Sequence, residues 1–271
     1  MDERFRRYPI GIQNFEQLRN NNCVYVDKTE LVYRLTHTDQ VYFLSRPRRF
    51  GKSLLVSTLE AYFQGKKDLF RGLAMERLEQ DWDPVLHIDF SISKYLSAHY
   101  LRSAINWFLE RWEREYGCCV EDKKGTPFSV RLGNVIESAY KKTGKAVVVL
   151  VDEYDSPMLD TNSDVALQGE LRGIMRDFFS PLKGMGQYLR FLFITGISKF
   201  SQMSIFSELN NLQNISMRDD FSAICGTPEE ALAQIDSKQY AVPYQADGRR
   251  VVKVGVNFDS ATRTIGEWIV R

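Results

Sequence analysis

VYFLSRPRRFGKSLL, residues 41–55, is the most informative stretch of the chain. Its first four residues are β-branched, aromatic or aliphatic and predict a buried strand. Gly51-Lys52-Ser53 then begins an amphipathic helix that we expect to reach about Phe63. A loop folded over a helix N-terminus points several backbone N–H groups at one spot, where the helix dipole also favours an anion. The stretch therefore has the layout of a phosphate-binding loop.

Residue types within this loop suggest individual roles. Gly51 lets the main chain come close to a phosphate, Lys52 reaches the β- and γ-phosphates, and the Ser53 hydroxyl ligates Mg²⁺. The usual pattern G-x-x-x-x-G-K-[ST] has a glycine where this chain has Arg46. The residues expected to bind nucleotide are Arg46, Pro47, Arg48, Arg49, Phe50, Gly51, Lys52, Ser53 and Leu54. The alternative is a chance Gly-Lys-Ser at a helix start.

KAVVVLVDE, residues 145–153, is the second strong signal. A continuous apolar run is typical of a strand buried in a parallel sheet, and its carboxylates fall at the carboxyl end, where open α/β sheets bind ligands. We expect Asp152 to hold Mg²⁺ through water and Glu153 to act as general base for the attacking water. Acidic residues also end strands merely because turns are solvated. A Gly-Lys-Ser loop about a hundred residues upstream favours a P-loop NTPase.

LRFLFIT, residues 189–195, predicts a further buried strand. Its terminal Thr195 is the candidate sensor of the γ-phosphate, with Ser198 as the second choice; an ordinary strand-ending threonine is the alternative. Lys199 or Arg218 would supply charge to the transition state, although nothing in the sequence assigns that role to either.

Hydrophobic periodicity places the remaining elements. A strand is expected at residues 85–90, and helices at about 97–116, 128–140 and 165–179. Asp27 and Thr29 are N-cap candidates for a helix that carries Leu31, Val32 and Leu35. The segment before that helix either packs beside the phosphate loop or forms part of the nucleotide base pocket. The aromatic side of residues 97–116 is expected to be core.

Composition is that of an ordinary globular protein. The 271 residues are 44% hydrophobic and 26% charged, and the net charge of +1 gives no global argument for nucleic acid or an anionic membrane. Four cysteines without C-x-x-C spacing disfavour a zinc site or a secreted disulfide framework, and three scattered histidines are expected to be structural or solvated. No apolar run reaches membrane-span length, and the first residues lack a signal-peptide core, so a cytoplasmic protein is expected.

Together these segments resemble the bacterial AAA-ATPase-like family. The resemblance is carried by YPIGIQNFEQLR, YVDKTELV, SRPRRFGKSLL, VVVLVDEYDSP, LRGIMRDFF and FLFITGISKFSQMSIFSELNNL, which cover roughly residues 5 to 230. In that family the loop without its first glycine is the regular form. The resemblance implies phosphate-site roles for Lys52 and Ser53, Mg²⁺ and water roles for Asp152 and Glu153, and the sensor role for Thr195.

Members of this family carry a C-terminal domain that resembles PD-(D/E)XK nucleases. We expect an ATPase-like domain at residues 1–228 and a truncated remnant of the nuclease-like domain at 229–271. Gln234 and Tyr240 match late positions of the nuclease fold, but we expect the part with the metal-binding carboxylates to be absent, so no nuclease activity is expected. Residues 240–256 predict a hairpin-like edge that packs on the core, pairs with another chain or stays mobile.

The expected fold is therefore α/β, a three-layer P-loop sandwich of the additional-strand type with a mostly parallel sheet. The resemblance places the phosphate-loop strand centrally and the Thr195 strand between it and the Asp152 strand. The expected function is ATP binding with slow Mg²⁺-dependent hydrolysis as a conformational switch. Two alternatives stay open: an ATPase module of a DNA-acting, nuclease-associated system, and a scaffold that binds nucleotide without hydrolysis. A homo-oligomer is compatible with the sequence, nucleic acid is weakly supported, and no membrane partner is expected.

Overall fold

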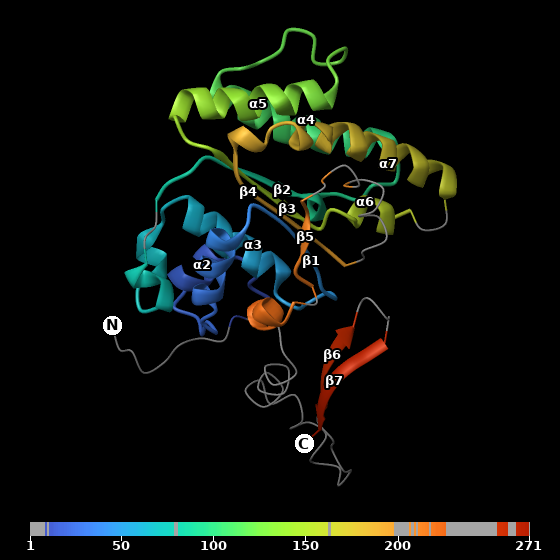
Figure 1. Cartoon of the computed structure of the whole chain (residues 1–271). Coiled ribbons are helices and arrows are strands. Elements are labelled where there is room, and N and C mark those ends of the chain that lie inside the picture. Colours follow the sequence, from blue (N-terminus) through green and yellow to red (C-terminus); the bar gives the residue numbers. More distant parts are fainter. Residues whose placement is uncertain are drawn as a thin grey trace.

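A five-stranded parallel sheet forms the centre of the computed structural model (Figure 1). The structure describes residues 9, 11–78, 81–161, 164–197, 206, 209, 211–216, 218–225, 254–259 and 264–270. The sheet has the order β2-β3-β4-β1-β5. Its strands are β1 Val41–Ser45, β2 Val85–Asp89, β3 Val147–Asp152, β4 Leu189–Gly196 and β5 Gln213–Asn214. The predicted α/β class with a mostly parallel sheet is confirmed.

Helices cover both faces of this sheet, which makes three layers. In Figure 1, α4, α5 and α7 lie over one face and α2 and α3 over the other. The helices are α1 Phe15–Asn20, α2 Thr29–Thr38, α3 Lys52–Phe63, α4 Ala98–Tyr116, α5 Phe128–Thr143, α6 Ser156–Leu159 and α7 Val165–Phe179. Short 3₁₀ turns connect them: η1 Lys67–Phe70, η2 Ala74–Arg77, η3 Phe90–Ile92, η4 Ser180–Lys183, η5 Gly186–Tyr188 and η6 Asp219–Ile224.

The strand order brings the sequence motifs together at the carboxyl ends of the strands. β4 lies between β1 and β3, as predicted, with Ser45 opposite Gly196 and Val151 opposite Ile194. In the described part of the chain, β1 is an interior strand of the sheet, with β4 on one side and the two-residue β5 on the other. Parallel strands end on the same side, so the segments that follow β1, β3 and β4 lie together.

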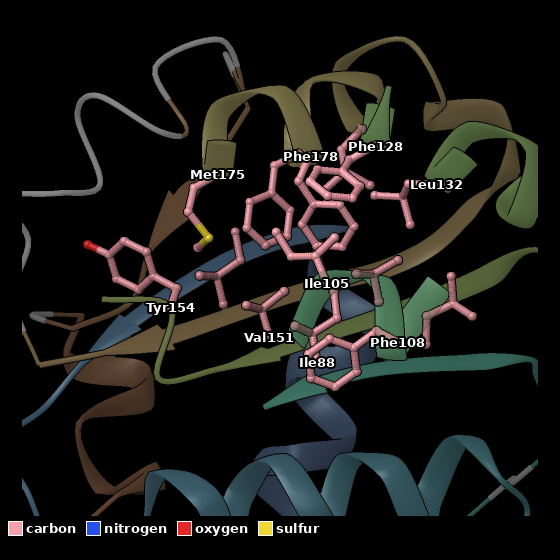
Figure 2. Close-up of a cluster of buried hydrophobic side chains, with 14 of the residues drawn as sticks. Ile88, Ile105, Phe108, Phe128, Leu132, Val151, Tyr154, Met175 and Phe178 are labelled. Atoms are coloured by element: carbon pink, nitrogen blue, oxygen red, sulfur yellow. The ribbon is translucent and has the colours of Figure 1, made fainter. Parts of the chain in front are cut away.

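Two apolar clusters hold the layers together. Figure 2 shows the one under α4, α5 and α7, where Ile88 and Val151 of the sheet meet Phe108, Phe128 and Phe178 of the helices. The aromatic side of α4 is buried as predicted, and only Trp107 among its large apolar residues from position 101 onward is exposed. The second cluster joins α1, α2 and α3 to the opposite face. Because β3 is buried along its whole length, a continuous apolar run was required there.

The start of α2 differs from the prediction in one detail. The helix begins at Thr29 and Lys28 occupies the N-cap position, but the cap is made by Asp27. Its Oδ1 accepts from Thr29 N at 2.9 Å and from the Thr29 hydroxyl at 2.7 Å, and its Oδ2 accepts from Ala74 N at 2.7 Å. Asp27 therefore caps α2 and also ties it to η2.

The C-terminal part contains an antiparallel pair of strands, β6 Val254–Asp259 and β7 Thr264–Val270, which forms a sheet separate from the five-stranded one. Of the predicted segment 240–256, residues 254–256 are described, and they lie in β6. Residues 240–250, Gln234 and Tyr240 lie outside the described residues. In the described part of the chain, no helix combines the length and apolar character that crossing a membrane requires.

Candidate functional site

The loop between β1 and α3 is built around an unusual backbone. Gly51, at the N-cap of α3, has φ +78°, and Arg49 has φ +69°. Glycine adopts this left-handed conformation without a steric penalty, whereas arginine does not. A Cβ at Gly51 would meet no atom within 4 Å, so the backbone angle rather than lack of space favours glycine there. The result is a tight turn that leads into a twelve-residue helix.

Lys52 lies folded back onto this loop. Only 4% of the residue is exposed, and its Nζ donates to the carbonyl oxygens of Arg46 at 3.0 Å and Pro47 at 3.1 Å. Burial lowers the pKa of the Lys52 ammonium, and the charges of Asp152, Glu153 and Asp155 partly oppose this. The ammonium is therefore held over the turn, where phosphate oxygens would be stronger acceptors than the two carbonyls.

Arg46 is anchored on both sides. Its backbone N donates to Gly196 O on β4 at 3.2 Å. Its guanidinium Nη1 donates to the carbonyl oxygen of Ser216, just beyond β5, and to Ser45 O at 3.5 Å. Burial lowers the pKa of this guanidinium. The residue that replaces the usual first glycine thus links the loop to its two neighbouring strands.

The other predicted binding residues are more open to solvent. Arg48 and Arg49 are exposed, and Pro47, Phe50, Ser53 and Leu54 are half-buried. Ser53 lies in the first turn of α3, directly after Lys52. The three loop arginines, grouped together from the sequence, are thus separated by the structure into one buried and two exposed side chains.

Asp152 and Glu153 are held in defined positions at the end of β3. The buried Asp152 accepts through Oδ1 from the Thr195 hydroxyl at 2.5 Å and from Glu153 N at 3.0 Å. Glu153 has φ +48°, a strained conformation for glutamate, and its Oε2 accepts from the Ser156 hydroxyl at 3.0 Å. The charges of both carboxylates reach Lys52, and β3 and β1 are parallel strands on either side of β4, so the two sequence motifs lie at the same end of the sheet.

Thr195 is buried on β4, where its hydroxyl is bonded to Asp152. Ser198 and Lys199 lie outside the described residues. Arg218 donates to both carboxylate oxygens of Asp220, at 3.0 and 2.7 Å, and its guanidinium lies over the Phe221 ring. Among the described residues, its guanidinium therefore contacts Asp220 and Phe221.

Sequence reasoning missed two residues that shape the site. Ser216 accepts through Oγ from Ser45 N at 2.8 Å, and nothing in the local sequence indicates this contact. Gly196 ends β4 where a Cβ would lie 2.4 Å from Tyr154 Cε1 and 2.8 Å from Asp155 Oδ1. The second case has a weak local signal, since a glycine directly after a buried strand often marks a close approach of other atoms.

Oxygen donors of the kind that Mg²⁺ prefers are present at the expected places. Asp152 supplies a carboxylate at the end of β3 and Ser53 a hydroxyl in the first turn of α3. Mg²⁺ is bound in nucleotide sites through one or two such groups together with water and phosphate oxygens. The residues therefore fit the ion that the phosphate-loop motif implies.

A strand, a basic loop with a buried lysine at a helix start, and carboxylates on a nearby parallel strand define a nucleotide-binding P-loop protein. Residues 9–206 match the family model described as predicted AAA-ATPase, and residues 208–268 match a PD-(D/E)XK nuclease superfamily model. The chain belongs to the predicted AAA-ATPase family, so the resemblance seen in the sequence is confirmed. This membership supports a nucleotide-binding ATPase module associated with a nuclease-like segment.

One similar protein is the "uncharacterized protein in vnfD 5′ region" of Azotobacter chroococcum mcd 1. It is 40% identical over 228 residues, which cover 83% of this chain and 43% of that protein. The chain thus spans less than half the length of this relative. The division at residues 228 and 229 stays a prediction; the nuclease-superfamily match begins earlier, at residue 208.

Proposed function

We propose that this chain binds ATP at residues 46–54 and hydrolyses it slowly with Mg²⁺, as a conformational switch. The observation that carries this proposal is the position of Lys52. Its ammonium is buried at the N-terminus of α3, donates to two loop carbonyls among the described residues, and lies within the electrostatic reach of Asp152 and Glu153. Exchange of those carbonyls for phosphate oxygens would give charge-assisted hydrogen bonds in place of neutral acceptors.

Each remaining residue has a task in this reaction. Ser53 and Asp152 would hold Mg²⁺, whose charge offsets the negative charge of the phosphates. Glu153 would accept a proton from the attacking water, and its backbone has a positive φ, which persists where the surrounding structure holds it. Thr195 would orient Asp152 through their hydrogen bond and sense the γ-phosphate indirectly.

Phosphate release from ATP tests the proposal. The intact chain, Lys52→Ala and Glu153→Gln are assayed with Mg²⁺, and nucleotide affinity is measured on all three. Lys52→Ala is expected to weaken binding at least tenfold, because it removes a charge-assisted contact. Glu153→Gln is expected to keep binding and lose turnover about a hundredfold or more, which is the usual share of a general base.

Lys141→Ala is the matched control, since this lysine is exposed on α5 and pairs with Glu137 four residues earlier. It should leave both readouts unchanged. Failure of the intact chain to bind ATP would overturn the proposal. Tight binding without turnover in the intact chain would favour the scaffold instead of the ATPase.

A second function is favoured by the match of residues 208–268 to the nuclease superfamily. In this second function, the ATPase module belongs to a DNA-acting, nuclease-associated system and controls it. It predicts that DNA stimulates phosphate release, and that DNA binding weakens steeply as salt is raised. ATP turnover that is indifferent to DNA at low salt would argue against it.

A further inference from the structure

The segment that follows β4 returns to the phosphate loop. β5 pairs with β1 through Tyr42 opposite Gln213 and Phe43 opposite Asn214, and Ile215 N donates to Phe43 O at 3.0 Å. Four apolar residues of this segment are buried in the same cluster as α3: Ile215, Phe221, Ile224 and Cys225. Residues 213–225 all fall inside the match to the nuclease superfamily. The first part of the nuclease-like match therefore forms the outer strand of the five-stranded sheet and packs against that side of it.

Ser216 makes the contacts that join this segment to the loop. Its hydroxyl accepts from Ser45 N at 2.8 Å, and its carbonyl oxygen accepts from the Arg46 guanidinium. Its own N–H donates to Asn214 Oδ1 at 3.0 Å, which fixes the turn after β5. Ser216 is buried, so neither contact is exposed to competition from bulk water. Ser216 thus forms hydrogen bonds with the last residue of β1 and with the first residue of the phosphate loop.

The guanidinium of Arg46 is a buried charge in need of an anion. Only 5% of the residue is exposed, and its Nε has no hydrogen-bond partner in the described part of the chain. No carboxylate of the described residues lies within ion-pair distance of it, and an arginine stays protonated in proteins. Burial of an unpaired charge is costly, so a phosphate group close to the loop would stabilise this side chain.

These contacts form a continuous path. Lys52 donates to the carbonyl of Arg46, the Arg46 guanidinium donates to Ser216, and Ser216 belongs to the segment that leads into the nuclease-like part. Cys225, directly after η6, is buried in the same cluster as α3, and its thiol lies near enough to Arg46 and Lys52 to influence the pKa of both, which places the far end of the segment beside the loop. A ligand that forms hydrogen bonds with Arg46 or Lys52 is therefore expected to change the contact between Arg46 and Ser216.

We propose that Ser216 is a positioning residue of the nucleotide site, through which bound nucleotide and the segment 213–225 at the start of the nuclease-like match influence each other. The inference rests on the nucleotide binding proposed above. Coupling of this kind is reciprocal: if nucleotide changes the packing of the segment, displacement of the segment changes nucleotide affinity by the same factor.

The test uses the full chain with Cys118 and Cys119 replaced by serine, because these two thiols are the more accessible ones. Three quantities are measured: the dissociation constant of a fluorescent ATP analogue, the rate at which a thiol reagent labels Cys225 with and without ATP, and the urea midpoint of the free protein. Cys225→Ser identifies the labelling signal against the buried Cys23. The variants are Ser216→Ala, the conservative Ser216→Thr, and Ser103→Ala, which lies on the exposed side of α4.

ATP is expected to change the Cys225 labelling rate at least threefold in the starting protein. Ser216→Ala removes the hydroxyl contact to Ser45 and leaves the backbone carbonyl contact to Arg46. It is expected to weaken nucleotide binding about tenfold, the effect of one buried hydrogen bond, and to reduce the response of Cys225. Ser216→Thr keeps a hydroxyl and should restore both, while Ser103→Ala should change neither.

Three outcomes would contradict the proposed role of Ser216. If the nucleotide binds but Cys225 does not respond to it, the coupling is wrong while the proposed function stands, and this holds even if Ser216→Ala fails to fold. If Ser216→Ala lowers only the urea midpoint and leaves affinity unchanged, Ser216 is merely structural. If the starting protein binds no nucleotide, the proposed function fails and the coupling fails with it.

Discussion

Gly196 shows how one residue without a side chain shapes the site. Any Cβ there would lie 2.4 and 2.6 Å from carbons of the fully buried Tyr154 ring. Gly196→Ala is therefore expected to lower the free energy of unfolding by about 2 kcal/mol, as overpacking does in other cores. Urea denaturation measures the change.

Gly173→Ala is the matched control, because this glycine is exposed within α7 and a Cβ would meet no atom within 4 Å. It should raise the free energy of unfolding by about 0.5–1 kcal/mol through helix propensity. Equal effects of the two changes would contradict the packing argument for Gly196.

His87 and Glu60 form a pair whose contribution depends on pH. His87 Nδ1 lies 3.0 Å from Glu60 Oε2. Burial by itself lowers the pKa of His87, but the hydrogen bond and charge of Glu60, helped by Asp152 and Asp89, outweigh it and raise the pKa above 6.5. Burial raises the pKa of Glu60, and the hydrogen bond and charge of His87, with Lys66 and Arg111, outweigh that and lower it below 4.5.

The stability from the raised pKa of His87 is fully present below its unfolded pKa and is lost as pH rises through the folded one. The stability from the lowered pKa of Glu60 is present above its unfolded pKa and is lost as pH falls through the folded one. The difference in unfolding free energy between the native protein and His87→Gln should thus be largest near about pH 5.5, about 1 kcal/mol, and shrink by about pH 8.5. Urea titrations at both pH values measure it, and a difference that grows with pH would contradict the pairing.

Elements α4 and α5 are joined by a buried ion pair. Arg131 donates to both carboxylate oxygens of Glu113, at 2.7 and 3.0 Å, and the two side chains are 0% and 1% exposed. A third bond runs from Arg131 to Asn106 Oδ1. Arg131→Met leaves the Glu113 carboxylate buried without its partner, so the free energy of unfolding should fall by about 3–5 kcal/mol.

The double change Arg131→Met with Glu113→Leu removes both charges and should recover most of that loss in the same urea assay. Lys141→Met removes an exposed ion pair on α5 and should stay within about 0.5 kcal/mol of the native protein. A double variant as unstable as the single one would show that packing, and not the unpaired charge, sets the cost.

The sequence predicted helices and strands correctly where the hydrophobic pattern extends over many residues. Helices α3, α4 and α7 and strands β1, β3 and β4 follow amphipathic or continuous apolar runs, and their bounds agree with the sequence to within a few residues. β5 and α6 were not foreseen. A two-residue strand has no period, and α6 has four residues beginning at Ser156-Pro157, which is also a turn signature.

On the scale of the whole molecule, completion of the sheet depends on residues beyond the ATPase family match. That match ends at residue 206, whereas β5 and its buried neighbours extend to residue 225. A chain cut after residue 225 should unfold cooperatively and bind nucleotide. A chain cut after residue 206 should do neither, because it loses β5, Ser216 and the large buried side chains Ile215, Phe221 and Ile224.

Each of those three apolar side chains contributes up to about 1.5–3 kcal/mol. Circular dichroism during urea titration, together with nucleotide affinity, compares the two fragments. Equal behaviour of the fragments would show that residues 207–225 are dispensable for the ATPase body.

The α/β class and the family could be read from sequence alone, and the sequence predicted that Lys52 and the carboxylates Asp152 and Glu153 serve one site. Apolar strands, amphipathic helices and the Gly-Lys-Ser motif are local patterns, and the family resemblance supplied the strand order. Only the tertiary structure revealed that Arg46 is a buried charge anchored to Ser216, or that Thr195 holds Asp152. Those contacts join residues 170 and 43 positions apart. Pairing of parallel strands across such separations is set by how the whole sheet assembles, and no local window of sequence encodes it.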